Sequence, residues 1–281
     1  VGVNVSANEF NFDTSEMIIS DKGNIIQATS GVVTSVTDNI EIKANEFKYN
    51  KKLSLLEAEQ GYAKSINDNI EIKANKFKYN SKESIINIDG NIEIKDFKNK
   101  ILIKSQSIFY NTKDKIIKSK NTSTIEDSLG NFFETKNFTY TLNDNLIKIT
   151  GAKIVDIEKN IIKVEKAYIN LKSNKLIGKD LSIDFNNKSF DKRNEPRLKG
   201  NTISADNQET VVSKGSFTLC KRNDDCPPWQ LSAKEIRHDK KRKIIHYKSA
   251  WLKLYDKPVL YFPRFFHPDP TVKRQSGFLM P

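Results

Sequence analysis

Residues 38–50 read DNIEIKANEFKYN, and residues 68–80 repeat the stretch as DNIEIKANKFKYN, thirty positions later and with one substitution. Ile40, Ile42 and Ala44 alternate with polar residues at the start of the first copy. Alternation with a period of two is the pattern of a β-strand that buries one face. A repeat at a fixed distance of 20 to 50 residues is typical of proteins built from stacked units.

A change of phase in the middle of each copy predicts a bend in this strand. Asn45 and Glu46 stand side by side as two polar residues, and Phe47 and Tyr49 resume the alternation one position later. One extra residue is what a β-bulge inserts, and a bulge bends the strand that carries it. Polar turn residues and a second short strand follow, so each unit of about thirty residues should contain two strands.

Spacing from the last aromatic residue of a copy locates weaker copies elsewhere in the chain. Ile86 and Ile88 follow Tyr79 after seven and nine positions, and Ile147 follows Tyr140 after seven. By this spacing, the chain contains about seven or eight units. No window has an apolar stripe with a period of 3.6, so we predict an all-β fold of stacked two-strand repeats with almost no helix.

Two stretches depart from the repeat. Residues 186–201 interrupt the rhythm with Pro196 and Gly200, and we expect a loop or insertion there. Residues 256–281 crowd aromatic residues together with prolines, which do not fit the middle of a sheet. We therefore expect a repeat domain at residues 1–255, followed by a segment that either caps the array or joins it to another domain.

Composition excludes several classes of protein. The net charge of +12 would suit a nucleic-acid ligand, but the lysines are spread through every repeat at outward positions, so we expect no nucleic-acid partner. A solvated surface and attraction to anionic lipid head groups both remain open. No run of 18 apolar residues is present to span a bilayer as a helix.

No pattern of catalytic or metal-binding residues is apparent. Phosphate loops, His-Glu-x-x-His pairs and Gly-x-Ser-x-Gly elbows are all absent, and His238 takes the place that Tyr79 has in the repeat. We expect neither enzyme activity nor a cofactor. Cys220 and Cys226 lack two further zinc ligands at a suitable spacing, and they favour an oxidised pair, local or to another partner, over free thiols.

The last fifth of the chain carries specific motifs. These are Trp229-Gln230, the Pro258 to Pro263 aromatic run, His267-Pro268-Asp269-Pro270 and the RQSGFL stretch at residues 274–279. Together they resemble the segment of the LptD (OstA) family of LPS-assembly outer-membrane proteins that joins the periplasmic domain to the barrel. The upstream repeats resemble the OstA-type β-jellyroll of lipopolysaccharide-transport proteins.

The resemblance implies a V-shaped, antiparallel β-taco at the periplasmic face of the outer membrane. Its inner face would carry lipopolysaccharide acyl chains from a periplasmic bridge protein of the same fold, LptA-like, toward the barrel. Residues 7–12 would form the open sheet edge that such a partner extends. A barrel after residue 281, absent from this sequence, would hold an LptE-like lipoprotein plug and the disulfide partners that the family pairs with periplasmic cysteines.

Inward-facing positions of the repeat are then the expected lipid contacts. They are Ile40, Ile42, Phe47, Tyr49, Ile70, Ile72, Phe77, Tyr79, Ile86, Ile88, Ile101, Ile103, Ile108, Phe138 and Ile147. Lys73, Lys78 and Asn87 should face outward. Three alternatives stay open: a soluble bridge protein of the same fold, a parallel β-helix that binds or acts on polysaccharide, and an interior that is only a closed core.

Overall fold

The structure, a computed structural model, describes residues 3–7, 9–186, 194–221, 227–269 and 272. These residues form nineteen β-strands and one three-residue 3-10 helix, Asp21–Gly23, which confirms the predicted all-β fold. The strands are β1 Val3–Ala7, β2 Phe10–Ser20, β3 Ile25–Ser35, β4 Ile40–Asn50, β5 Leu55–Ser65, β6 Ile70–Asn80, β7 Ile85–Asp96, β8 Ile101–Asn111, β9 Ile116–Ser119, β10 Ser123–Glu126, β11 Phe132–Thr141, β12 Leu146–Val155, β13 Ile161–Asn170, β14 Lys175–Asp184, β15 Arg197–Ala205, β16 Glu209–Thr218, β17 Trp229–Asp239, β18 Ile244–Leu254 and β19 Lys257–Pro268.

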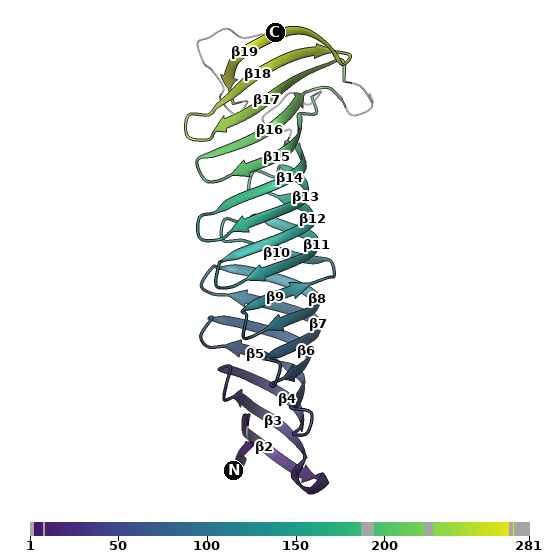
Figure 1. The fold of residues 1–281 in the computed structure, drawn as a ribbon, viewed down its shortest axis with the longest axis vertical. Helices are drawn as coiled ribbons and strands as arrows, with labels where there is room; N and C mark the ends of the chain where they lie inside the picture. The colour runs from purple at the N-terminus through teal and green to yellow at the C-terminus, as the bar shows by residue number, and fades with distance from the viewer. Residues whose placement is uncertain (1–2, 8, 187–193, 222–226, 270–271, 273–281) are drawn as a thin grey trace. The chain divides into compact units, whose positions relative to one another are not determined.

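By its internal contacts the chain divides into unit 1, Val1–Ile147, and unit 2, Lys148–Pro281. In unit 1, β2 to β9 stack in chain order, and in unit 2, β13 to β19 do the same (Figure 1). Each of these strands pairs antiparallel with its sequence neighbour, as β4 does with β5 and β5 with β6. Antiparallel pairing excludes the parallel β-helix for these strands.

A corner divides each long strand of unit 1 into two halves. Along β4 the side chains alternate inward as far as Ala44, then Asn45 and Glu46 are both exposed, and the alternation resumes at Phe47. Asn45 faces Gln60 of β5, but the ladder skips this pair and continues on either side of it. The predicted bend is therefore confirmed, and the two halves of a strand enclose one interior.

Positive backbone angles mark the same corner on the neighbouring strands. Ser30 and Gln60, thirty positions apart, have φ of 44° and 52°. Asn45 Nδ2 donates to Gln60 Oε1 at 3.3 Å, and Ser15 Oγ donates to the Ser30 carbonyl oxygen at 2.7 Å, so a polar residue recurs every fifteen positions. Strands β9 and β10 are the two halves of one strand that is interrupted at this corner, because β8 pairs with both.

Hairpin turns alternate between two rims of unit 1. The turns at residues 36–39, 66–69 and 97–100 follow one end of the strands, and we call them rim 1, together with Glu9 in the β1–β2 turn. Rim 2 consists of the turns at residues 21–24, 51–54, 81–84, 112–115 and 142–145. Asn39 and Asn69 take φ of 53° and 55° in rim 1, where asparagine tolerates the left-handed conformation better than most residues.

The N-terminal edge differs from the prediction. Phe10 and Phe12 are buried, because β1 covers that half of β2 on one side and β3 covers it on the other. Among the described residues, the second half of β2 has a partner strand on the β3 side only, and Ile18 and Ile19 there are 65% and 55% exposed. Among the described residues, the open edge therefore lies at residues 15–20 and along β1, which includes Ala7, and not at residues 10–12 of the predicted range 7–12.

The core of unit 2 is built mainly by β14 to β18 and includes Tyr247 and Ala250. Strand β15 starts at Arg197, within residues 186–201, where we expected a loop. The prediction of a loop is therefore wrong for residues 197–201. Gly200 suggests a turn in the sequence, and so the strand was not predicted. In the structure Gly200 lies at a corner against the side chain of Val212, where no side chain fits. Pro258 and Pro263 lie in β19, whose only described strand partner is β18, and prolines are tolerated on such an edge.

Candidate functional site

All fifteen predicted inward positions lie inside unit 1. They belong to β4, β6, β7, β8, β11 and β12, and their side chains are between 0% and 4% exposed. Neighbouring positions point outward, as Lys73 and Asn87 do beside Ile72 and Ile88. The predicted parity is thus confirmed, while the lipid contact itself remains a proposal.

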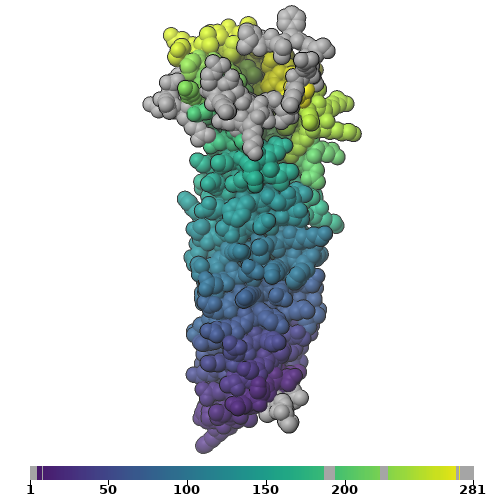
Figure 2. Space-filling view, turned by 180° about the vertical axis from the view of Figure 1, so that it is seen from behind, coloured from purple at the N-terminus to yellow at the C-terminus, as the bar shows by residue number. Residues whose placement is uncertain are grey.

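Side chains fill this interior in the structure. Phe77 and Ile88 are fully buried, and the Phe10 ring packs edge-on against Tyr49 and Tyr79, with ring centroids 5.0 and 5.4 Å apart. On the face drawn in Figure 2, the side chains of unit 1, coloured purple to teal, form a continuous surface. Fully burying such a side chain contributes about 1.5 to 3 kcal/mol, so the packing stabilises the two halves against each other.

Four tyrosine hydroxyls reach from the interior to four carboxylates, three in rim 1 and one, Asp96, at the end of β7 next to rim 1, and we call this row the tyrosine seam. Its pairs are Tyr49 with Glu9, Tyr79 with Asp38, Tyr110 with Asp68 and Tyr140 with Asp96. In each pair the tyrosine hydroxyl donates and the carboxylate accepts, and the partners are 40 to 44 residues apart in sequence.

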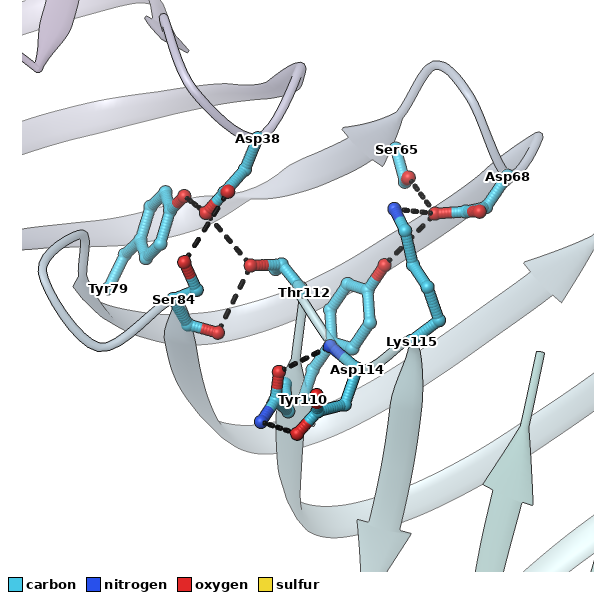
Figure 3. A network of polar contacts seen from close by, with 10 residues as sticks. Asp38, Ser65, Asp68, Tyr79, Ser84, Tyr110, Thr112, Asp114 and Lys115 are labelled. Carbon is cyan, nitrogen blue, oxygen red and sulfur yellow. Dashed lines mark hydrogen bonds and ion pairs between the residues drawn. The ribbon is translucent and has the colours of Figure 1, made fainter. Parts of the chain in front are cut away.

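Further donors of rim 2 converge on the same carboxylates (Figure 3). Asp38 accepts from Thr112 Oγ1 at 2.8 Å and from Ser84 Oγ at 3.4 Å. Lys115 Nζ lies 2.6 Å from Asp68 Oδ2 and forms an ion pair that is largely shielded from solvent. Rim 2 thus supplies the hydroxyl and ammonium groups for the carboxylates of rim 1.

Burial and these bonds shift the pKa values of the seam. Burial raises the pKa of the Tyr79 hydroxyl above its usual range, and the hydrogen bond to Asp38 raises it further. Burial would raise the pKa of Asp68 as well, but the hydrogen bonds from Lys115 and Ser65 outweigh it and lower that pKa. The pKa of Glu9 is lowered in the same way, against burial, mainly by the Ser81 hydroxyl. The shifts therefore favour the neutral form of Tyr79 and the charged forms of Glu9 and Asp68.

Sequence reasoning assigned Tyr49 and Tyr79 to the apolar interior and missed the carboxylates. The signal was available in the repeat, since Asp38 and Asp68 are thirty positions apart, as the two tyrosines are. From alternation alone, an aspartate in a turn is expected to be exposed to solvent. The pattern does not show which turns lie against each other in the folded chain.

Unit 2 has a related polar pair in place of a tyrosine. His238, which takes the place of Tyr79 in the repeat, lies with its Nε2 2.6 Å from Asp269 Oδ2. Tyr247 is joined to His267 Nε2 at 3.0 Å, and burial lowers the pKa of that histidine. Among the described residues, no group of three or more His, Cys, Asp or Glu side chains is placed to hold a metal ion.

Cys220 lies after β16, with its thiol 3.6 Å from the carbonyl oxygen of Trp229. Cys226 lies outside the described residues, so the oxidised state of the two cysteines stays a prediction. The motif at residues 274–279 also lies outside the described residues. Of the proposed joint at residues 256–281, the structure describes residues 256–269, which include β19, and residue 272. In the described part of the chain, no helix has the length and apolar character that a bilayer span requires.

Comparison with known proteins agrees with the resemblance seen in the motifs. Residues 58–152 match the family described as "Lipopolysaccharide-assembly, LptC-related". The chain is 38% identical over 76 residues, 27% of its length, to the LPS-assembly protein LptD of Sodalis glossinidius. It is 25% identical over 164 residues, 58% of its length, to the LPS-assembly protein LptD of Idiomarina loihiensis.

These matches span 9% and 18% of the two relatives, so the chain covers less than a fifth of either. The family match covers most of β5, all of β6 to β11 and most of β12, and thus includes much of the interior and three of the four seam tyrosines. Over these stretches the chain is thus similar to an LptC-related lipopolysaccharide-assembly family and to two LPS-assembly proteins named LptD.

Proposed function

We propose that unit 1 carries the acyl chains of lipopolysaccharide between the two halves of its bent strands. The observation that carries the proposal is the run of apolar inward positions along β4 to β12, in a chain similar to LPS-assembly proteins. Each methylene group removed from water contributes about 0.8 kcal/mol, so a few exposed rungs suffice to hold an acyl chain reversibly. The role is transport without a chemical step, and so the protein is not an enzyme.

The place and partners of this transport follow from the same proposal. The domain would lie at the periplasmic face of the outer membrane and receive lipid from an LptA-like bridge protein at the N-terminal edge. Residues 15–20, with Ile18 and Ile19 exposed, pair with β3 on one side and offer their other edge for such a partner to extend. The lipid would then pass toward a barrel that holds an LptE-like lipoprotein.

Adjacent positions of β6 test the interior. Phe77 is buried and Lys78 points outward on the same strand. A photo-crosslinking residue at Phe77 therefore tests the inner face, and one at Lys78 tests the outer face. We expect the probe at Phe77 to capture lipopolysaccharide and the probe at Lys78 to capture little. Equal capture at both positions would place the lipid on the outer surface, and no capture at Phe77, Ile88 or Ile108 would make the interior a core alone.

A further inference from the structure

We propose that the tyrosine seam is a latch, which opens along the two rims of unit 1 to admit acyl chains from the side. This inference rests on the proposed function, because it concerns how a lipid enters the interior. Since the interior side chains are 0% to 4% exposed, a guest can enter only if the two halves of the bent strands move apart.

Backbone hydrogen bonds between successive turns run along each rim. In rim 1, Ile66 N donates to Asn39 O at 3.3 Å and continues the row that Val36 N begins on Glu9 O. In rim 2, Ser81 N donates to Ser54 O at 3.1 Å. The remaining members of these rows are Phe97 N on Asn69 O in rim 1, and Lys51 N on Asn24 O, Thr112 N on Ser84 O and Leu142 N on Lys115 O in rim 2. Each row holds its own rim together.

Side chains alone make the hydrogen bonds described between one rim and the other. Asp38 of rim 1 accepts from Tyr79, Thr112 and Ser84 at the rim 2 side, and Asp68 accepts from Lys115 (Figure 3). The seam and the apolar packing are therefore what close the rims, and opening them leaves both backbone rows in place.

The corner supplies the hinge for such a movement. The ladder between β4 and β5 skips the pair of Asn45 and Gln60, so the two halves are joined there without a paired rung. The corner bond that is present joins exposed side chains, Asn45 and Gln60, at 3.3 Å. A change of angle at this line costs less than breaking the ladder of either half.

Locking the rims together tests the latch. In a chain with C220S and C226S, the pair D38C and T112C replaces side chains whose oxygens are 2.8 Å apart across the rims. Oxidation, or a short bismaleimide where the pair does not oxidise, should reduce capture of lipopolysaccharide by a probe at Phe77 about tenfold or more. That loss is what prevention of an opening step predicts, and reduction of the disulfide in the same protein should restore capture.

A matched control joins two turns of one rim. The pair N24C and K51C lies in rim 2, where Lys51 N donates to Asn24 O at 2.9 Å and neither side chain belongs to the seam. Crosslinking this pair should leave capture unchanged. Undiminished capture by the protein locked across the rims would overturn the latch and leave the proposed function standing.

Loosening the seam gives a second readout that needs no lipid. Y79F keeps the buried ring and removes the hydroxyl that donates to Asp38, while Y62F removes the same group from a tyrosine that is 38% exposed. A cysteine at Ile88 should react with a maleimide about tenfold or more faster in Y79F, the change expected for loss of one hydrogen bond to a charged group. Equal rates in Y79F, Y62F and the parent would refute the latch, whereas accelerated labelling without any lipid capture would refute the proposed function.

Discussion

Tyr79 occupies two environments at once. Its ring lies in the apolar interior beside Phe10, and its hydroxyl lies at the rim, where it donates to Asp38 and is 3.1 Å from Ser35 Oγ. A phenylalanine would fill the same volume, so the hydroxyl is the part of the residue that the apolar packing does not explain. Each seam tyrosine is therefore expected to contribute to stability in a way that depends on pH.

Alkaline unfolding measures that contribution. Because the pKa of Tyr79 is raised in the folded chain, its stabilising effect is complete below the unfolded pKa, about 10, and is lost as the pH rises beyond it. The free energy of unfolding should then fall by about 1.4 kcal/mol per pH unit for this residue. Urea titrations between pH 9 and about 11.5 should show a shallower decline in Y79F than in the parent or in Y62F. A decline as steep in Y79F as in the parent would contradict this assignment.

At the scale of the element, the corner decides how the strands bend. Gly61 pairs with Ala44 of β4 at the corner, and a Cβ at Gly61 would overlap the carbonyl oxygen of Lys43 and lie 2.8 Å from the Cα of Ala44. Its neighbour Gln60 instead adopts a φ of 52°, which an L-residue reaches only at a cost. Two adjacent residues thus meet opposite requirements.

Substitutions at these two positions should have opposite signs. G61A forces the two backbones apart and should lower the free energy of unfolding by about 1 to 3 kcal/mol, the usual range for overpacking. Q60G relieves the cost of the positive φ, and the entropy that glycine adds to the unfolded chain offsets part of this gain. The free energy of unfolding should therefore stay the same or rise by up to about 1 kcal/mol. Chemical denaturation of both variants checks the pair, and equal destabilisation by both would argue against the corner geometry.

Sequence pattern predicted the elements better than their meeting points. Alternation and the doubled polar pair at Asn45 gave the strands, the bend and the inward face, because all three depend on neighbours along the chain. The seam depends on Asp38 meeting Tyr79 three strands later, which no local period encodes. Strand β15 was not predicted for a similar reason. A contact with another strand requires Gly200, but in the sequence alone a glycine at this position indicates a turn.

For the whole molecule, the charge of +12 and the apolar interior offer a lipid two different modes of attachment. Ion pairs on the outer face, such as Lys78 Nζ with Glu57 Oε1 at 3.2 Å, are exposed and contribute little to stability. Attraction of the surface to anionic head groups would depend on ionic strength, whereas burial of acyl chains would not.

Salt therefore separates the two modes. The Debye length falls from about 30 Å at 0.01 M salt to about 3 Å at 1 M, which removes attraction between exposed charges. Capture of lipopolysaccharide by a probe at Phe77 should persist over this range, and any capture by a probe at Lys78 should decline. Loss of both signals together would mean that surface charge holds the lipid.

The span of the seam bonds also bears on how unit 1 folds and comes apart. In an array whose units contact only their neighbours, stability is close to a sum of unit and nearest-neighbour terms, and the ends fray independently. The bond from Thr112, in the turn after β8, to Asp38, in the turn before β4, adds a term between hairpins that are not adjacent. A hairpin at the end of the array is thus tied to one further in, which makes the transition more cooperative than stacking alone would. During synthesis, each seam bond has to wait until the chain is about forty residues longer, so the rims close behind the growing sheet.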